Sequence, residues 1–228
     1  MTVALSSWRP FIQMPMVPLP AIEQAVLDAA IRFCEGSHIW KHTLDRINVV
    51  GDQAGYSLSL STAMAAYARI IGVAAAWYKQ DGEEDSSFTR LDPLSADHED
   101  RVQYDAWHLD SSSTPSNYYV NASDPTTLYL YPIPEDDSDE GLLVKVCLRP
   151  IEGATVLPDI LYNQYRRQIA TGARAYLYGT PGMPWSNPNK ANELEIVFDE
   201  MIAAANLVAM KGLTHQELTV QFRGDSWL

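Results

Sequence analysis

Patterns typical of amphipathic helices lie at both ends of this chain, and a pattern typical of strands lies between them. The helical patterns span residues 20–38, 157–178 and 188–211, each with an apolar stripe at a period of about 3.6 residues. An isolated amphipathic helix cannot bury its stripe, so the first helix is expected to pack against the last two. The predicted fold class is α+β: a discontinuous helical bundle, one N-terminal helix plus two C-terminal helices, with an inserted antiparallel β domain and a C-terminal arm.

The expected helices carry recognisable boundary residues. Gly179 and Gly212 follow the last two runs, and Gly36 is expected to end the first helix or to loosen its last turn, as glycine is common just past helix ends. Asn187 is expected to cap the last helix, with Pro188 at its first position. The apolar stripes are Ile22, Val26, Ala29 and Phe33 in the first helix, Leu161, Tyr165, Ile169, Gly172 and Tyr176 in the second, and Ala191, Leu194, Phe198, Ile202, Ala205 and Val208 in the third.

Residues 47–150 are expected to be mostly sheet. Near the start of this segment the period falls to about two, with Tyr56, Leu58 and Leu60 alternating against serines. Aromatic and β-branched residues, which favour strands, recur up to the run that ends at Pro150.

Some local details of this region are predicted from short signals. A strand is expected to enter a hairpin turn at Asp81–Gly82, although the alanines leave a helix open for residues 63–76. Asp92–Pro93 is expected to start a short helix, as N-cap and first position. A turn at Asp124–Pro125 is expected to separate two aromatic-rich strands.

This organisation divides the chain into three parts. The bundle takes residues 1–46 and 151–212, the β domain takes residues 47–150, and an arm takes residues 213–228. The arm alternates apolar side chains as a strand added to the edge of a partner's sheet would, and it ends on an aromatic anchor. The arm residues expected to bind a partner are Leu218, Val220, Phe222 and Trp227. The alternative is that this segment folds back as an edge strand on the β domain of its own chain.

The composition excludes several classes of protein. The 228 residues carry a formal net charge of -13, which disfavours binding through contacts to nucleic-acid phosphates. The sequence has no signal peptide and no apolar run of the roughly 20 residues that a membrane span needs, so a soluble, intracellular protein is expected. Cys34 and Cys147 are expected to be free buried thiols.

No motif predicts a catalytic, cofactor or metal site. Cys34, His38 and His42 recur every four residues, but a buried thiol with two surface or capping histidines is the favoured interpretation. Residues 97–100, DHED, are interpreted as a solvated charge run, and residues 135–140, EDDSDE, as a mobile acidic loop without the spacing of a calcium site.

The joint between the last two helices, residues 180–193, holds a large aromatic among prolines and asparagines. Prolines fix φ and remove backbone donors, so the joint is expected to be stiff. Trp185 is therefore a candidate partner-binding residue that contacts a neighbouring subunit, or else it packs on the core of its own helical hairpin.

Three segments together resemble the head-to-tail adaptor, or connector, proteins of tailed bacteriophages. They are residues 20–42, 127–150 and 161–212, in that order along the chain. The resemblance implies a structural virion protein, not an enzyme and without a cofactor. It implies a ring of twelve copies that binds the portal protein and a tail or nozzle protein in the neck of the virion, after assembly in the host cytoplasm. Genomic DNA would pass through the ring without specific binding, which suits an acidic lining.

Two alternatives stay open at this point. A tail-completion or tail-tube protein shares the ring geometry and differs in its partner. A small-molecule-binding protein or enzyme would instead hold a pocket between helices and sheet near His98, Trp107 and His108.

Overall fold

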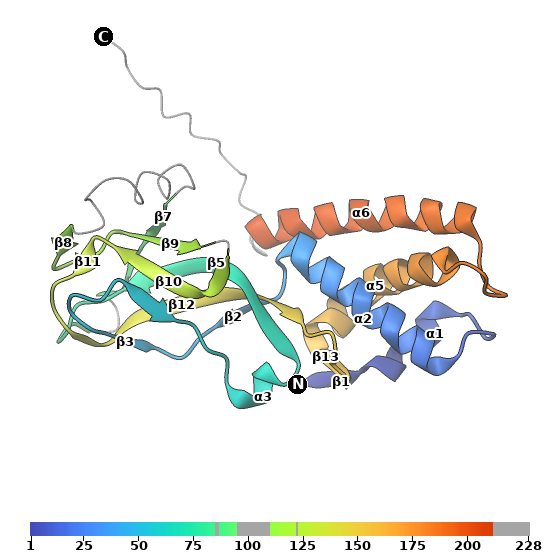
Figure 1. Ribbon diagram of the computed structural model, residues 1–228, viewed down its shortest axis with the longest axis horizontal. Helices are drawn as coiled ribbons and strands as arrows, with labels where there is room; N and C mark the ends of the chain where they lie inside the picture. Colours follow the sequence, from blue (N-terminus) through green and yellow to red (C-terminus); the bar gives the residue numbers. More distant parts are fainter. Residues whose placement is uncertain (85–86, 95–109, 122, 212–228) are drawn as a thin grey trace, which may run out of the picture.

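Three long helices pack together although the whole sheet region separates the first from the other two along the chain. They are α2 (Leu19–Ser37), α5 (Asp159–Gly179) and α6 (Pro188–Lys211). The computed structural model describes residues 1–84, 87–94, 110–121 and 123–211. Figure 1 shows an elongated molecule with the helices at one end and the sheets at the other. The α+β class and the discontinuous bundle are as predicted.

The predicted bounds of the three helices agree with the structure to within two residues, but Gly36 and Gly179 lie inside their helices, and Gly212 lies outside the described residues. The backbone N–H of Lys190 donates to Asn187 Oδ1 (3.2 Å), so Asn187 caps α6 as expected. Helix α2 continues through Gly36 to Ser37 and ends with His38 in the left-handed region at φ 52°. Gly36 instead allows close packing, because a Cβ there would lie 2.5 Å from Ile202 Cγ2 of α6.

Three short helical segments complete the helical part: the 3₁₀ helix η1 (Leu5–Trp8), α1 (Arg9–Ile12) and α3 (Thr62–Ala65). The Trp8 ring packs edge-on against Tyr162 of α5, with ring centroids 4.9 Å apart. This contact fixes the N-terminal segment on the bundle.

The strands form two main sheets and two short strand pairs. They are β1 (Thr2–Ala4), β2 (Lys41–Thr43), β3 (Ile47–Val49), β4 (Gly55–Ser57), β5 (Ala68–Tyr78), β6 (Thr89–Arg90), β7 (Asp92–Pro93), β8 (Ser111–Ser112), β9 (Asn117–Asn121), β10 (Asp124–Tyr131), β11 (Ile133–Pro134), β12 (Ser138–Pro150) and β13 (Val156–Pro158). One main sheet has the order β2-β12-β5-β6, with β3 also on β12, and the other has the order β4-β10-β9-β7. Strand β1 pairs with β13, and β8 pairs with β11.

Strand β12 is the central element of the first sheet. It pairs antiparallel with β2, β3 and β5, and its register with β5 runs from Leu142↔Tyr78 to Pro150↔Ala68. Pairing is antiparallel throughout except for the short pairs β7–β9 and β8–β11, which are parallel. Because β2 lies before residue 47, the sheet begins earlier than the predicted domain boundary.

Two local predictions are corrected, and one open alternative is decided. Asp92–Pro93 forms strand β7 and not a helix start, because Asp92 N donates to Ser116 O (3.0 Å) and Leu94 N donates to Tyr118 O (2.8 Å). The ambiguous residues 63–76 divide between α3 and β5. Asp124 belongs to β10, where its carboxylate accepts hydrogen bonds from Thr126 and Thr127, so the turn precedes it.

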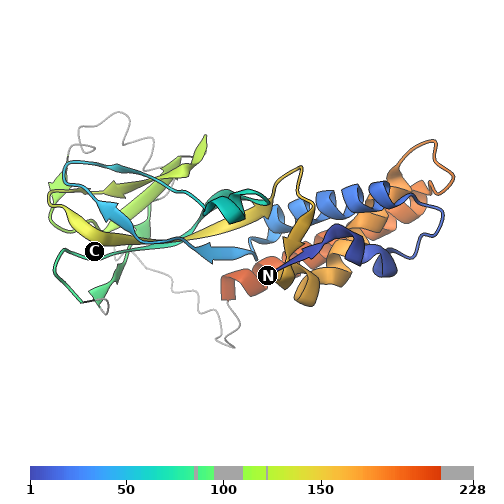
Figure 2. The same ribbon diagram turned by 90° about the horizontal axis from the view of Figure 1, so that it is seen from below.

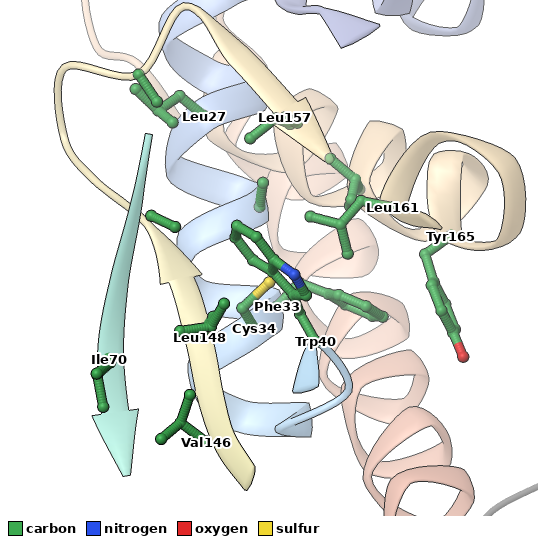
Figure 3. Close-up of a cluster of buried hydrophobic side chains, with 14 of the residues drawn as sticks. Leu27, Phe33, Cys34, Trp40, Ile70, Val146, Leu148, Leu157, Leu161 and Tyr165 are labelled. Atoms are coloured by element: carbon green, nitrogen blue, oxygen red, sulfur yellow. The ribbon is translucent and has the colours of Figure 1, made fainter. Parts of the chain in front are cut away.

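One continuous apolar core joins the bundle to the sheet. Phe33, Leu161 and Phe198 belong to this core, as predicted, and the rings of Phe33 and Phe198 are stacked with centroids 6.3 Å apart. Figure 3 shows the region where α2, β5, β12, β13 and α5 meet. Labelled there are Leu27, Phe33, Cys34, Trp40, Ile70, Val146, Leu148, Leu157, Leu161 and Tyr165.

Candidate partner-binding surface

Helix α6 packs on the bundle through a narrow seam. Ala191, Phe198 and Ala205, spaced seven residues apart, are its buried residues. Side chains of α6 pack directly on the backbone of its neighbours at two glycines: Ile202 on Gly36 of α2 and Phe198 on Gly172 of α5. A seam of small residues and one aromatic leaves much of the circumference of α6 facing solvent.

The solvent-facing side of α6 carries large apolar side chains. Exposed fractions reach 63% for Ile196, 53% for Leu207 and 69% for Met210, and Ala203 is also exposed. With Glu200 these residues form what we call the outer stripe: Ile196, Glu200, Ala203, Leu207 and Met210. Successive spacings of four and three residues are those of a coiled-coil seam, a helix face that normally packs against another element.

The outer stripe extends sideways and overlaps the edge of the predicted stripe. Val197 and Val208 are each 39% exposed, although Val208 was expected to be buried. Tyr176 of α5, placed on the apolar stripe of its helix by the sequence, is 60% exposed. Several large apolar side chains exposed on one side of a helix are typical of interaction sites on soluble proteins.

Polar contacts on the inner side fix the rotation of α6. Arg32 of α2 pairs with Glu195 and with Asp199 (2.7 Å), and its guanidinium lies 5.5 Å from the centroid of the Phe198 ring. The hydrogen bond with Glu195 raises the pKa of Arg32 above its ordinary value. Lys41 Nζ donates to Ala209 O (2.6 Å) at the end of the helix. These contacts hold the outer stripe toward solvent.

Two carboxylates on the outer side of α6 are left unpaired. Glu193 and Glu200 have no hydrogen-bond or ion-pair partner among the residues that the structure describes, whereas Glu195 and Asp199 both bind Arg32. The exposed face of α6 is therefore both apolar and acidic.

The joint between α5 and α6 is tied to the helix that precedes it. The backbone N–H of Asn187 donates to Tyr178 O (2.8 Å), and Ser186 Oγ donates to the same oxygen (3.4 Å). Trp185 is partly buried against the core of its own chain, and its Nε1 is buried without an acceptor within the described ranges. The contact that the structure gives Trp185 is thus with its own bundle.

Open grooves flank the bundle. One of about 490 Å³ lies beside the joint and is lined by Ala175, Tyr176, Gly179, Thr180, Pro181, Ala191, Asn192 and Glu195. Another of about 300 Å³ lies where α5 and α6 meet the sheet and is lined in part by Lys41 and Lys145.

Cys34, His38 and His42, which recur every four residues in the sequence, have different structural roles. Cys34 is fully buried, and the backbone N–H of His38 donates to Cys34 O (2.9 Å) as it ends α2. His42 lies on β2. Among the described residues, no three His, Cys, Asp or Glu side chains come close enough together to hold a metal ion.

The acidic segment 135–140 is ordered by its own side chains, contrary to the expectation of a mobile loop. Asp137 Oδ1 accepts from the backbone N–H of Gly51 (2.8 Å), and Glu140 pairs with Arg46 (3.1 Å). Ser138 Oγ donates to Lys79 O (2.8 Å), and Ser138 opens strand β12. Carboxylates that accept hydrogen bonds from donors elsewhere in the sheet hold this segment in place.

Several residues singled out from the sequence lie outside the part of the chain that the structure describes. They are the arm residues Leu218, Val220, Phe222 and Trp227, the DHED run at 97–100, and the pocket residues His98, Trp107 and His108. The outer stripe was missed by the sequence analysis. A second apolar period in residues 196–210, opposite the predicted one, was the signal that could have found it.

Within the described ranges, no helix combines the length and apolar content that crossing a membrane requires. No protein-family model matches this chain, and no curated protein matches its sequence.

Proposed function

We propose that this chain is a structural virion protein of a tailed bacteriophage, a head-to-tail adaptor whose copies form a ring between the portal and the tail. The observation that carries the proposal is the outer stripe of α6. This stripe consists of large apolar side chains with coiled-coil spacing, and the ion pair with Arg32 fixes the rotation of α6 so that they face solvent. Such a surface favours a function in which the protein binds other chains.

The elongated shape supports the same interpretation. The long helices lie side by side at one end of the molecule, and the sheets extend from the other end (Figure 1). Such a protomer offers its helices for contacts between copies and keeps its two ends for different partners. We propose that these partners are the portal protein and a tail or nozzle protein, and that the ring has twelve copies in the neck of the virion.

The charge agrees with a passage for DNA. A formal net charge of -13 gives a ring of many copies a strongly negative field, which repels phosphates and disfavours tight contacts with the duplex. On this proposal the genome slides through the ring without being held, and the protein has no catalytic role.

Mixing the purified protein with the portal protein and, separately, with tail components of the phage that encodes it tests the proposal. Electron microscopy and sedimentation should show closed rings of this chain on the portal. A protein that stays monomeric alone, with portal and with tail would refute it. Binding to the tail without binding to the portal would favour a tail-completion protein instead.

A further inference from the structure

We propose that the outer stripe of α6 in one copy binds the exposed N-terminal lead, residues 9–20, of the next copy; this inference rests on the proposed ring. The occupant of the stripe is therefore a second copy of this chain, bound through a different surface. The argument depends on the surface of the lead, on its position in the bundle and on charge.

The lead is the second exposed apolar surface of the bundle. Met16 is 76% exposed and Leu19 is 37% exposed, and four exposed prolines lie around them, at positions 10, 15, 18 and 20. A shallow pocket of about 450 Å³ opens here, lined by Arg9, Pro10, Gln13, Met14 and Pro15. Methionine side chains adapt to the shape of a partner, and prolines keep the backbone of such a surface rigid.

The lead and the stripe lie on opposite sides of the bundle. Figure 1 shows α6 along one edge and α1 along the other, with α2 and α5 between them. Both views show α1 at the same position along the long axis of the molecule as the N-terminal half of α6 (Figures 1 and 2). Two different surfaces on opposite sides make a head-to-tail contact, which closes into a ring when the rotation between copies allows it.

The charges of the two surfaces are complementary. Between Lys190 and Lys211, every charged residue of α6 is acidic, and Glu193 and Glu200 have no partner within the described ranges. In the lead, Arg9 is the only Lys, Arg, Asp or Glu before Glu23.

A second cation lies on the surface of the lead. The Arg166 guanidinium lies 5.0 Å from the centroid of the Phe11 ring. In the part of the chain that the structure describes, neither Arg9 nor Arg166 pairs with a carboxylate. An apolar surface with unpaired cations thus matches an apolar surface with unpaired carboxylates.

The same charges disfavour contact between two α6 helices. Such a symmetric contact would bring two acidic stripes together. The repulsion between their carboxylates would destabilise that pairing. The lead offers apolar contact without this repulsion.

Charge reversal on each surface tests the contact. Glu200→Arg and Arg9→Glu should each lower ring formation at least tenfold, measured by sedimentation and by electron microscopy with and without portal. Arg90→Glu, an exposed reversal on strand β6 of the sheet, is the control and should leave ring formation unchanged. Far-ultraviolet circular dichroism and the melting temperature verify that each variant folds.

Mixing the two defective variants gives the decisive result. In an alternating ring of equal parts Glu200→Arg and Arg9→Glu protein, every junction again joins opposite charges, so rings should return. The chain that carries both substitutions should also form rings by itself.

Each other outcome overturns one proposal or the other. If the wild-type protein forms rings and both reversals assemble as well as it does, the contact is wrong and the adaptor function stands. The contact is equally wrong if the reversals fail and the mixture does not recover, or if the wild-type protein forms only α6-to-α6 dimers. If the wild-type protein forms no ring under any condition, the proposed function itself fails.

Discussion

Gly172 of α5 lies directly against the ring of Phe198 of α6. A Cβ built on Gly172 would be 2.6 Å from both Cε1 and Cζ of that ring, closer than real side chains approach. Phe198 is only 1% exposed and stacks on Phe33, so its ring has little room to move. The absence of a side chain at one position therefore sets the distance between the two helices.

Replacing Gly172 with alanine is expected to destabilise the protein. Overpacking a core typically costs 1–3 kcal/mol, which exceeds the gain of about 1 kcal/mol that alanine brings to a helix interior. A net loss of up to about 2 kcal/mol should appear in urea denaturation. Gly72→Ala in β5 is the matched control, because a Cβ there would contact nothing within 4 Å. Equal stabilities of the two variants would contradict the close packing.

Removing the Phe198 ring should reverse the sign of the Gly172 substitution. Phe198→Ala alone is expected to cost about 3–5 kcal/mol, because it leaves a cavity in the core. In that background Gly172→Ala has room for its methyl group and should stabilise the helix by up to about 1 kcal/mol. A double-mutant cycle measures this coupling, and additive effects would show that the two residues do not interact.

The cap at the start of α6 is expected to contribute to stability. Asn187→Ala removes the side-chain acceptor for Lys190 N, and the loss of such a cap costs about 0.5–2 kcal/mol. Asn189→Ala, two residues further along and exposed, is the control. A shift in the urea midpoint that is the same for both variants would argue against capping by Asn187.

The ion pairs of Arg149 should make stability depend on pH. Arg149 is 9% exposed and binds Glu35 (3.2 Å) and Glu152 (2.8 Å). The hydrogen bond from Arg149 holds the pKa of Glu152 below its ordinary value, so the folded state favours the charged carboxylate. This stability is present above the pKa of the unfolded chain, about 4.3, and is lost as the pH falls through the folded pKa.

Glu152→Gln should therefore melt below the wild-type protein at pH 7, and the difference should shrink as the pH is lowered below about 4. Glu193→Gln is the control, because Glu193 is an exposed carboxylate without a partner in the described ranges. The melting temperature of this variant should follow that of the wild-type protein across the pH range. A difference that stays constant from pH 7 to pH 3 would mean that the carboxylate charge of Glu152 is not responsible.

Both cysteines should resist thiol reagents in the folded protein. Cys34 is 0% exposed and Cys147 is 5% exposed, and burial raises the pKa of each thiol, so little thiolate forms. A chromogenic disulfide reagent should detect no thiol in the native state and two after denaturation in guanidinium. Rapid reaction of a native thiol would contradict the buried positions.

The helices could be predicted because their signals are local and agree with one another. Asn187, Pro188 and the apolar period specify α6 without reference to the rest of the chain. Asp92–Pro93 carries the same kind of signal, yet forms a strand, because the backbone N–H groups of Asp92 and Leu94 donate to Ser116 and Tyr118, far along the chain. Long-range hydrogen bonds between strands can override the local preference of a segment for a helix.

The sequence could not show that the outer stripe is the exposed apolar face of α6, for a related reason. Two apolar periods overlap in α6, and which one is buried depends on where Gly36 and Gly172 allow a close approach. The exposed fractions of Ile196 and Leu207 became known only with the packing. Trp185 likewise offers an aromatic in a stiff joint, and only the packing shows it resting on its own bundle.

The interrupted course of the bundle along the chain bears on the order of folding during synthesis. Helix α2 leaves the ribosome early, but its contacts with α5 and α6 form only after the whole sheet region has been made. The antiparallel pairing of β12 with β2, β3 and β5 is complete by Pro150, so the first sheet can form before the bundle closes. Until α5 and α6 have been made, Phe33 lacks its aromatic partners Tyr165 and Phe198, and a nascent chain stalled before Asp159 presents the apolar face of α2 to chaperones.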